Sequence, residues 1–353
     1  MDATPPKNNE APNHQLISII VPCRNEVNYI DNFLTIVFQQ IKPDSMDIQV
    51  VIADGESEYS RHEKIEICDQ REDRLLIVEK TKKTTPAGLN IAISQTIGET
   101  IIRMDVHTIY AADYVKNCVE NLYKTGASCV GGAWRAATSP GRAGAIAAAF
   151  GSRFGSGGAA SRRVDYTGPV DTVYLGTWRR SDLLKLGGFD ETLLRTEDDE
   201  LNLRIIRSGG KVWQSADIKC WYQPRSSFKA LAAQIYQYGY WKVPLIRKHH
   251  APASPRHLVP VFFVFTILSL LFFGFFYPLA WLLQGFVLFS YAAVALISAA
   301  LIEKPWAKPV RWLSIAWSFV CMHFAYGFGF GHALIDLCAG RKNAGEFVTR
   351  LTR

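Results

Sequence analysis

The sequence predicts an α/β domain built on a mostly parallel sheet, followed by a helical region embedded in a membrane. As far as about residue 225, short apolar segments rich in β-branched residues alternate with segments of helical periodicity. This alternation is typical of parallel strands joined by helices. Beyond it lie two long stretches, 258–302 and 312–335, that contain no Asp, Glu, Lys or Arg. Stretches of this length and polarity suit the hydrocarbon core of a bilayer.

Composition and the first residues narrow the class of protein. Residues 1–15 are polar and rich in proline, without the apolar core of a signal peptide, so we expect them to be disordered and the following domain to stay in the cytoplasm. The seven cysteines form no Cys-x-x-Cys pair, which favours reduced thiols. We attribute the net charge of +7 to a surface beside anionic lipid or to a phosphate-bearing substrate, and not to nucleic acid.

The strands and helices of the first domain follow from apolar runs and their periodicity. Four strands are expected first, at Ile17–Val21 (ending at Pro22), Ile48–Ala53, Leu75–Val78 and Thr100–Met104. Helices are expected from about residue 28, at 86–96 and at 113–125, and later strands at 128–132, 171–178 and 211–214.

Polar residues follow three of these strands. The loop Pro22–Glu26 comes after the first strand, Asp54 after the second, and Asp105 with His107 after the fourth. Doubly wound sheets bind nucleotides at the carboxyl ends of their strands, although an ordinary turn with a helix cap remains an alternative for Asp54. Alternation along an extended chain places Asp105 and His107 on the same side, where both suit Mg²⁺ or Mn²⁺ completed by phosphate oxygens.

The acidic stretch Glu197–Glu200 is the feature around which the first domain is organised. Neighbouring carboxylates repel one another, and a carboxylate pushed toward an apolar wall has a raised pKa. Such a group beside a cleft is suited to act as a general base. The alternative is a solvated acidic helix start, with Thr196 as the N-cap and the carboxylates at the positive end of the helix dipole.

Two further segments of the front part have open interpretations. Residues 139–169 are rich in Gly, Ala, Ser and Arg, and we expect a mobile segment over the site with one short helix at 144–150. Its arginines would either grip phosphates or belong to a solvated linker. Residues 226–250 predict an amphipathic helix, broken at Pro244, that lies at the membrane interface or packs as an ordinary helix.

The apolar region predicts membrane spans at 258–276 and 279–302, joined as a hairpin, and a third span at 312–337. The basic loop 303–311 then lies in the cytoplasm with the first domain. A third span places the basic tail outside, against the positive-inside rule, and an interfacial or re-entrant third segment would remove this conflict. We expect three spans. The predicted organisation is 1–15 disordered, 16–225 catalytic, 226–256 interfacial, 257–340 transmembrane and 341–353 a basic tail.

The order of several motifs resembles family 2 glycosyltransferases over roughly residues 16–245. The motifs are Ser18–Glu26, Asp54–Ser57, Asp105–His107, Gly187–Asp190 and Glu197-Asp198. The resemblance implies the GT-A fold, which has a Rossmann-like sheet, a nucleotide-sugar donor that is usually a UDP-sugar, and a divalent cation.

The resemblance also implies roles for individual residues. Asp198 matches the catalytic base of the family's Glu-Asp motif, beside Glu197. Asp105 matches the first Asp of its Asp-x-Asp motif, and His107 stands where the metal-binding second Asp is usual, which favours Mn²⁺ over Mg²⁺. Nucleotide-sugar contacts are expected from Pro22, Arg24, Glu26, Asp54, Asn90, Asp105 and Arg180.

The stretch after the first domain resembles the Gln-x-x-Arg-Trp motif of processive synthases. Here Gln237 and Trp241 are kept and Tyr240 replaces the Arg. The resemblance implies that these three residues contact the acceptor, while the replaced Arg and the few spans argue against a processive polysaccharide channel.

These inferences predict an inverting glycosyltransferase in the bacterial plasma membrane, with its catalytic domain in the cytoplasm. It would add one sugar, with glucose as the first choice, from a UDP-sugar to a polyprenyl-diphosphate-linked saccharide, within a possible polysaccharide-assembly complex. Direct transfer to polyprenyl phosphate is a second hypothesis. A non-catalytic nucleotide-sugar-binding scaffold is a third.

Overall fold

The structure is a computed structural model, and it forms two compact units. One comprises Met1–Arg135 and Arg163–Tyr222, and the other Ala136–Arg162 and Gln223–Arg353. The described residues are 13–24, 26–44, 46–55, 74–79, 84–137, 139–341 and 345–349. The first twelve residues, Asn25, the Glu56-Ser57 pair and most of the basic tail lie outside the described residues.

The first unit alternates strands and helices as the periodicity predicts. Its strands are β1 (Asn13–Cys23), β2 (Asp47–Asp54), β3 (Leu75–Glu79), β4 (Gly98–Arg103), β5 (Ile109–Tyr110), β6 (Cys129–Gly132), β7 (Arg135–Ala136), β8 (Gly168–Pro169), β9 (Tyr174–Arg179), β10 (Val212–Gln214) and β11 (Cys220–Tyr222). Its helices are α1 (Val27–Phe38), α2 (Thr85–Ser94), α3 (Tyr114–Thr125), α6 (Arg180–Lys185) and α7 (Glu197–Arg207).

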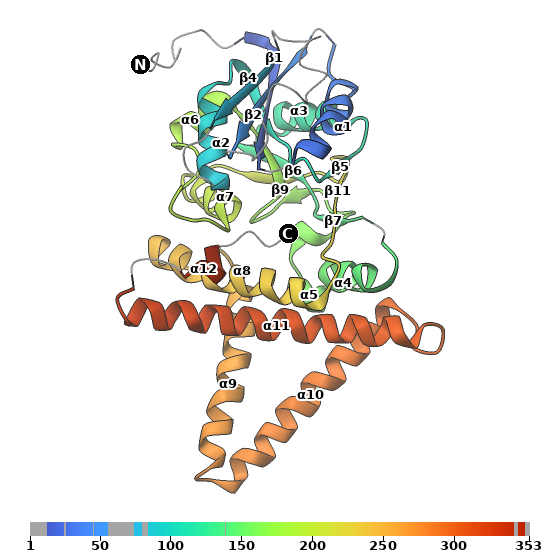
Figure 1. The fold of residues 1–353 in the computed structure, drawn as a ribbon, viewed down its shortest axis with the longest axis vertical. Helices are drawn as coiled ribbons and strands as arrows, with labels where there is room; N and C mark the ends of the chain where they lie inside the picture. Colours follow the sequence, from blue (N-terminus) through green and yellow to red (C-terminus); the bar gives the residue numbers. More distant parts are fainter. Residues whose placement is uncertain are drawn as a thin grey trace. The chain divides into compact units, whose positions relative to one another are not determined.

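The main sheet has eight strands in the order β3-β2-β1-β4-β9-β6-β10-β8. Strands β3, β2, β1 and β4 run parallel to one another, but β9 runs antiparallel to both β4 and β6. The α/β class is therefore confirmed, with a mixed sheet. Figure 1 shows α1 and α3 on one side of this sheet and α2 and α6 on the other.

The core explains why the central strands are continuous apolar runs. Ile17, Ile19 and Val21 of β1 lie in one buried cluster with Phe33 of α1 and Tyr114 of α3, while other strand residues are buried against the opposite helices. The expected stop at Pro22 is wrong by one residue. The strand continues to Cys23. Pro22 is tolerated because the described pairing with β4 ends at Ile20, so that Pro22 pairs only with β2.

The second unit is helical. It contains α4 (Gly141–Gly151), α5 (Arg153–Ser156), the 3₁₀ turn Ala160–Arg162, α8 (Phe228–His249), the 3₁₀ turn Pro255–Leu258, α9 (Val259–Gly274), α10 (Pro278–Ile302), α11 (Pro309–Cys338) and α12 (Glu346–Thr349). Three of its helices are long and apolar enough to cross a membrane: Pro255–Gly274, Pro278–Ile302 and Pro309–Cys338.

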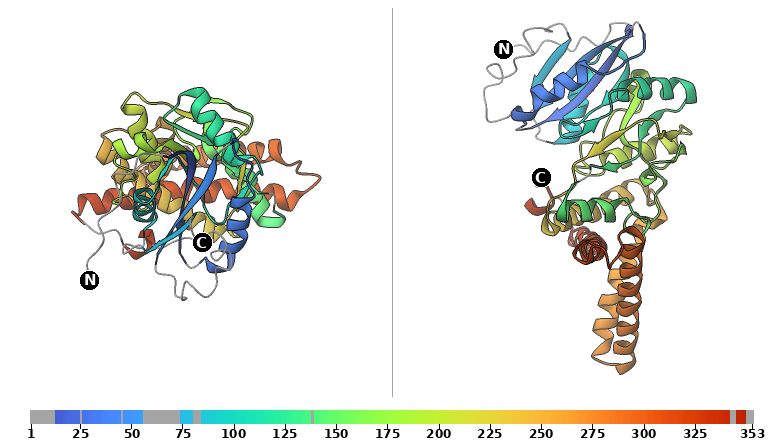
Figure 2. Two further views of the ribbon diagram at one scale, coloured as in Figure 1. Left: turned by 90° about the horizontal axis from the view of Figure 1, so that it is seen from above. Right: turned by 90° about the vertical axis from the view of Figure 1, so that its right-hand side faces the viewer.

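Within this unit the long helices have two different directions. Helices α8 and α11 lie side by side, and α9 and α10 form a hairpin that projects away from α11 (Figure 1). The right-hand view of Figure 2 looks along α11, and the hairpin again extends from one side of it.

Two expectations are wrong here. Helix α8 continues through Pro244 without a break. The segment expected to move over the site instead contributes α4 and α5 to the helical unit, where the ring of Phe154 lies 5.0 Å from that of Phe319 in α11.

Candidate active site at the carboxyl ends of the strands

The first unit brings the predicted strand-end residues to one edge of the sheet. In the parallel register Cys23 of β1 is opposite Asp54 of β2, and Ile20 is opposite Arg103 of β4. The loop after β1, the end of β2 and Asp105 therefore lie at the same edge. Asp54 and Glu26 are both buried there.

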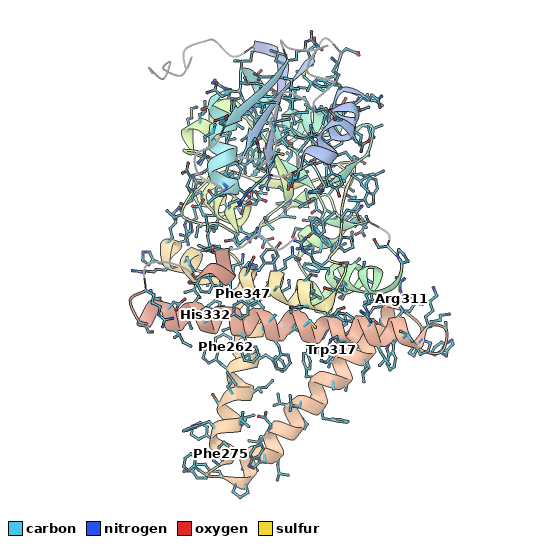
Figure 3. All side chains as sticks on the ribbon, viewed as in Figure 1. Phe262, Phe275, Arg311, Trp317, His332 and Phe347 are labelled. Atoms are coloured by element: carbon cyan, nitrogen blue, oxygen red, sulfur yellow. The ribbon has the colours of Figure 1, made fainter. Side chains whose placement is uncertain are left out.

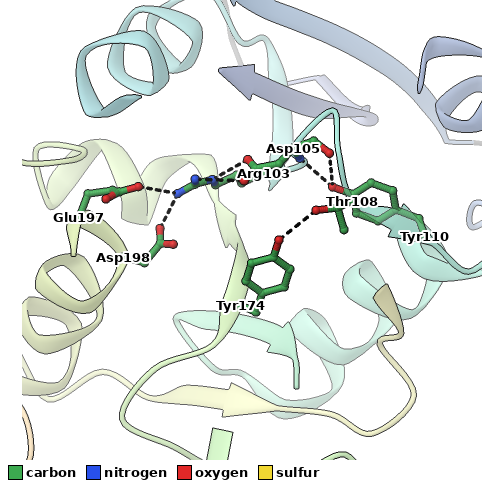
Figure 4. A network of polar contacts seen from close by, with 7 residues as sticks. All are labelled: Arg103, Asp105, Thr108, Tyr110, Tyr174, Glu197 and Asp198. Carbon is green, nitrogen blue, oxygen red and sulfur yellow. Dashed lines mark hydrogen bonds and ion pairs between the residues drawn. The ribbon is translucent and has the colours of Figure 1, made fainter. Parts of the chain in front are cut away.

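A buried arginine in the central strand joins three carboxylates (Figure 4). Arg103 has a side chain that is only 6% exposed, and its Nε lies 3.1 Å from Asp105. Its terminal nitrogen lies 2.7 Å from Asp198 and 3.3 Å from Glu197. One positive charge thus faces three negative ones. Arg103 was not predicted from the sequence. Its place inside an apolar strand was a signal, because arginines are rarely buried without partners.

This network sets the protonation of Asp198. Burial raises the pKa of Asp198 to about 7, and the charge of Arg103 opposes that rise while Glu197, Asp105 and Asp199 add to it. The surrounding carboxylates in turn raise the pKa of Arg103 well above its usual value despite its burial. The Asp198 side chain is 29% exposed to solvent. Asp198 is therefore a carboxylate that takes up and releases a proton near neutral pH, as a general base requires.

Backbone strain precedes the two carboxylates. Helix α7 begins at Glu197, and the residue before it, Thr196, has a left-handed backbone with φ of 66°. A β-branched residue rarely adopts this conformation. Thr196 is the N-cap residue and the four carboxylates lie in the first turn, as the alternative expected, but the Thr196 hydroxyl makes no capping hydrogen bond. An ion pair of 2.7 Å between Arg204 and buried Glu200 fixes the helix further along.

The turn before α7 is held by Asn90 of α2. The Asn90 side-chain nitrogen donates to the carbonyl of Phe189 at 2.8 Å, and its oxygen accepts from the Phe189 amide at 2.8 Å. Gly188 has a φ of 69°, and a Cβ there would come within 2.5 Å of the Asn90 oxygen. The structure therefore gives Asn90 the role of positioning this turn, where the sequence analysis expected a nucleotide contact.

Asp105 and His107 have different partners. Their segment is a turn, closed by a hydrogen bond from Thr108 to Asp105, so the alternation argument is wrong. The Tyr110 hydroxyl accepts from the Asp105 amide at 2.7 Å and donates to its carbonyl at 3.0 Å. His107 lies instead 3.1 Å from Glu26.

These contacts test the fit of a divalent cation. The described residues hold no group of three or more His, Cys, Asp or Glu that would bind a metal by themselves. Asp105 fits as a single carboxylate ligand, because Mg²⁺ and Mn²⁺ commonly bind through one or two carboxylates and the phosphates of the substrate. His107 would have to leave Glu26 to join it.

Comparison with known proteins agrees with this geometry. Residues 18–183 match the family described as Glycosyl transferase family 2. The chain carries a family 2 glycosyltransferase domain. It is 27% identical to the succinoglycan biosynthesis protein ExoA of Rhizobium meliloti (strain 1021) over 245 residues. These residues are 69% of this chain and 74% of ExoA.

Two further proteins are similar over most of the chain. The dolichyl N-acetyl-alpha-D-glucosaminyl phosphate 3-beta-D-2,3-diacetamido-2,3-dideoxy-beta-D-glucuronosyltransferase of Methanococcus voltae is 26% identical over 335 residues, which is 90% of this chain and 97% of that enzyme. The solved structure of mannosyltransferase PcManGT from Pyrobaculum calidifontis, in complex with GDP-Man and Mn²⁺, has 20% identity and a TM-score of 0.55. It covers 96% of this chain and 90% of that one, which confirms the GT-A fold.

Arg180, expected to contact the nucleotide-sugar, and its neighbour Arg179 lie away from this edge of the sheet. Arg179 is opposite Thr100 in the antiparallel β4–β9 pair, about 16 Å of strand away from Asp105 at roughly 3.3 Å per residue. Arg179 donates to carbonyls at the end of α3, and Arg180 donates to Thr96. Neither arginine, including Arg180 as a nucleotide contact, is near the carboxylates.

The residues expected to contact the acceptor are buried in the helical unit. Gln237 donates to the carbonyl of Phe347 at 2.8 Å, and Trp241 donates to that of Val348 at 3.0 Å, so both hold α12 against α8. The Tyr240 hydroxyl donates to Asp336 of α11 at 3.0 Å. These contacts give the three residues a packing role, and we do not include them in the proposed acceptor site.

Proposed function

We propose that this glycosyltransferase is inverting and non-processive, and that it moves one sugar from a UDP-sugar to a polyprenyl-diphosphate-linked saccharide during exopolysaccharide assembly. Glucose is the donor sugar to test first. The observation that carries the proposal is the Asp198 carboxylate, which is paired with buried Arg103 and has a pKa raised to about 7.

The chemistry is a single displacement. Asp198 takes the proton of the acceptor hydroxyl, the acceptor oxygen forms a bond to the anomeric carbon, and the bond from that carbon to the nucleoside diphosphate breaks. One displacement inverts the configuration, so an α-linked donor gives a β-linkage. Arg103 keeps Asp198 and Glu197 together while leaving the network with an excess of negative charge.

The donor would bind at the ends of the parallel strands. Asp54, Glu26 and the Pro22–Arg24 loop are assigned to the nucleoside, and Asp105 would hold a divalent cation with the diphosphate oxygens. When bound, this cation neutralises charge on the leaving diphosphate. Tyr110 supports this role, because its two hydrogen bonds fix the Asp105 backbone.

Two lines of support point to a lipid-linked acceptor at a membrane. The name of the Methanococcus voltae relative describes a sugar acceptor linked to dolichyl phosphate, and that of ExoA describes polysaccharide synthesis. Three helices of this chain are long and apolar enough to cross a membrane. We place the enzyme in the bacterial plasma membrane with its catalytic domain in the cytoplasm.

The test uses membranes that carry the full chain and the host's own lipid-linked acceptors, supplied with Mn²⁺ and labelled UDP-glucose. We expect label in the organic-extractable lipid, and a loss of about 10²- to 10⁴-fold with Asp198→Asn. Other labelled UDP-sugars and GDP-mannose are run in parallel. Label only in water-soluble products would contradict the lipid acceptor, and UDP binding without any transfer would contradict catalysis.

A matched variant separates the base from the surrounding charge. Asp199→Asn removes a neighbouring carboxylate of the same helix turn that is not in contact with Arg103 by any described ion pair. We expect this variant to keep most of its activity, because the proton acceptor remains.

A further inference from the structure

Helices α8 and α11 approach so closely that only glycine fits at two reciprocal points. A Cβ on Gly239 of α8 would come within 2.1 Å of the carbonyl oxygen of Tyr326 in α11. A Cβ on Gly329 of α11 would come within 2.0 Å of the carbonyl oxygen of Tyr236 in α8. Packing this close, with glycine on both helices, fixes the two axes side by side over their central turns.

Polar contacts lock the same pair of helices. The Tyr236 hydroxyl lies 2.9 Å from His332 Nδ1, and the Tyr240 hydroxyl donates to buried Asp336 at 3.0 Å. Asp336 also forms ion pairs with His332 at 3.3 Å and Arg341 at 2.9 Å. Separating α11 from α8 would break the two contacts that cross between the helices and leave the hydroxyls of Tyr236 and Tyr240 without these partners.

Helix α8 is too polar to enter the hydrocarbon core. Lys229, Lys242, Arg247 and Lys248 lie within its bounds, and charged side chains at the bilayer centre are strongly disfavoured. Among the described residues before α8, no helix is long and apolar enough to cross a membrane. Helix α8 therefore stays on the side of the membrane that holds the catalytic domain, and α11 stays with it.

The face of α11 turned away from α8 is apolar. Leu313, Trp317, Phe328 and Ile335 are exposed and recur at helical spacing, so they form one stripe. Residues such as Phe319 on the opposite face are buried. Figure 3 marks Trp317 on α11, with Phe262 on α9 and Phe275 at the end of the hairpin.

We propose that α11 lies in the plane of the membrane surface, with this stripe in the lipid leaflet next to the catalytic domain, and that only α9 and α10 cross the bilayer. The partner of the stripe is the acyl and headgroup boundary of that leaflet. Basic residues flank the stripe at Lys304, Lys308 and Arg311, where anionic headgroups complement them. This proposal replaces the expectation of three spans and does not depend on the proposed function.

The hairpin has the dimensions and chemistry of a two-helix crossing. The 20 residues from Pro255 to Gly274 extend roughly 30 Å at about 1.5 Å per residue, which matches the hydrocarbon thickness. The hairpin tip exposes Phe275, Phe276 and Tyr277 and no charged side chain. Aromatic residues of this kind lie at the membrane–water interface, here that of the far leaflet.

Two crossings return the chain to the side on which it began. The basic tail after α11, which begins at Arg341, then lies with the catalytic domain, and the positive-inside rule is obeyed. The conflict between the span count and the charge of the tail disappears.

The first experiment places the end of α11 by thiol labelling of the full chain in intact spheroplasts. Cys338 is exposed at the end of α11, and Cys68 and Cys321 are replaced by Ser. We expect a membrane-impermeant maleimide to label Cys338 only after the membrane is permeabilised. The matched control, Tyr277→Cys at the hairpin tip with Cys338→Ser, should be labelled without permeabilisation. Labelling of Cys338 in intact spheroplasts would overturn the proposal.

The second experiment measures depth in vesicles containing anionic lipid. Trp317→Cys and Phe328→Cys are each labelled with a small fluorophore and quenched by spin-labelled lipids. In the proposed arrangement both probes lie at the same shallow depth. If α11 crossed the membrane, the probes would differ in depth by about 16 Å, since they are eleven residues apart at roughly 1.5 Å per residue. A depth difference of that size would overturn the proposal even if the labelling of Cys338 were ambiguous.

Discussion

Each unit contains a network of charged side chains around a buried residue, Arg103 in one and Asp336 in the other, and the two networks differ in balance. In the catalytic unit, Arg103 faces the three carboxylates of Asp105, Glu197 and Asp198. In the helical unit, the single carboxylate of Asp336 accepts a hydrogen bond from Tyr240 and forms ion pairs with His332 and Arg341.

The difference shows how similar groups serve opposite purposes. Where three donors surround one carboxylate, its charge is balanced, and the hydrogen bond from Tyr240 links α8 to α11. Where carboxylates outnumber the cation, the excess negative charge and the burial together raise the pKa of Asp198 to about 7. The network around Asp336 holds α11 in place, and the network around Arg103 leaves Asp198 able to accept a proton.

Removing the cation of the unbalanced network is expected to have the largest effect. Arg103→Met leaves three carboxylates without their partner, which should lower the free energy of unfolding by about 3–5 kcal/mol. Arg135→Met is the control, because Arg135 donates only to the carbonyls of Val164, Ala216 and Ile218 in the described contacts. Denaturant unfolding measures both, and an equal loss in the two variants would contradict this account.

The pH dependence of kcat/KM tests the raised pKa of Asp198. The base must be deprotonated, so activity should rise with pH through about 7 and be about 100-fold lower at pH 5 than at pH 8. Glu197 raises the pKa of Asp198, so Glu197→Gln should move the acid limb to lower pH. A flat profile between pH 5 and 8 would remove Asp198 as the base.

The raised pKa of Asp198 should also make stability depend on pH, in the direction opposite to that of activity. The pKa of Asp198 is higher in the folded chain than the ordinary value of 3.8. The folded state therefore binds the proton more tightly, and the contribution of this group to stability is fully present below about pH 4 and lost as pH rises through 7. Asp198→Asn should accordingly be at least as stable as the parent at pH 8.

Breaking the balanced network should cost less and leave the chemistry unchanged. Asp336→Asn removes the ion pairs with Arg341 and His332 but keeps an acceptor for Tyr240, so we expect a smaller loss of stability than for Arg103→Met. Thermal unfolding in detergent measures this loss. The acid limb of kcat/KM should stay where it was, and a shift of that limb would show that the two networks are not independent.

The smallest expected effect concerns Asn90. Asn90→Ala removes the bonds to Phe189 and should cost about 1–2 kcal/mol. The control is Asn121→Ala, whose amide donates only within α3, to Asn117, in the described contacts. If Asn90 were a nucleotide contact instead, the KM for the donor would rise while the stability stayed constant.

The sequence predicts much of the catalytic unit because apolar runs and strand ends are local features. The strands before Asp54 and Asp105 are recognisable from a few residues each, and parallel strands bring their carboxyl ends to one edge. The acidic stretch Glu197–Glu200 is recognisable from its crowding of charge, and the resemblance to family 2 glycosyltransferases singles out Asp198 within it.

The missed features depend on partners far along the chain. Arg103 and Asp198 are 95 residues apart, and nothing local announces their contact. Arg180 was misplaced because strand direction is invisible in a strand's own residues, and β9 runs antiparallel to β4. Gln237 and Tyr240 were misassigned because the buried face of α8 is set by α11 and α12.

The glycine contact between α8 and α11 has a consequence for how the chain is made. Tyr326 follows the end of α8 at His249 by 77 residues (326 − 249), which a ribosome needs on the order of ten seconds to add. The hairpin of α9 and α10 is made during that interval, and throughout it the face of α8 that packs on α11 has not yet met α11. A ribosome that stalls before α11 is made would therefore release a catalytic domain attached to an α8 whose docking face is still exposed.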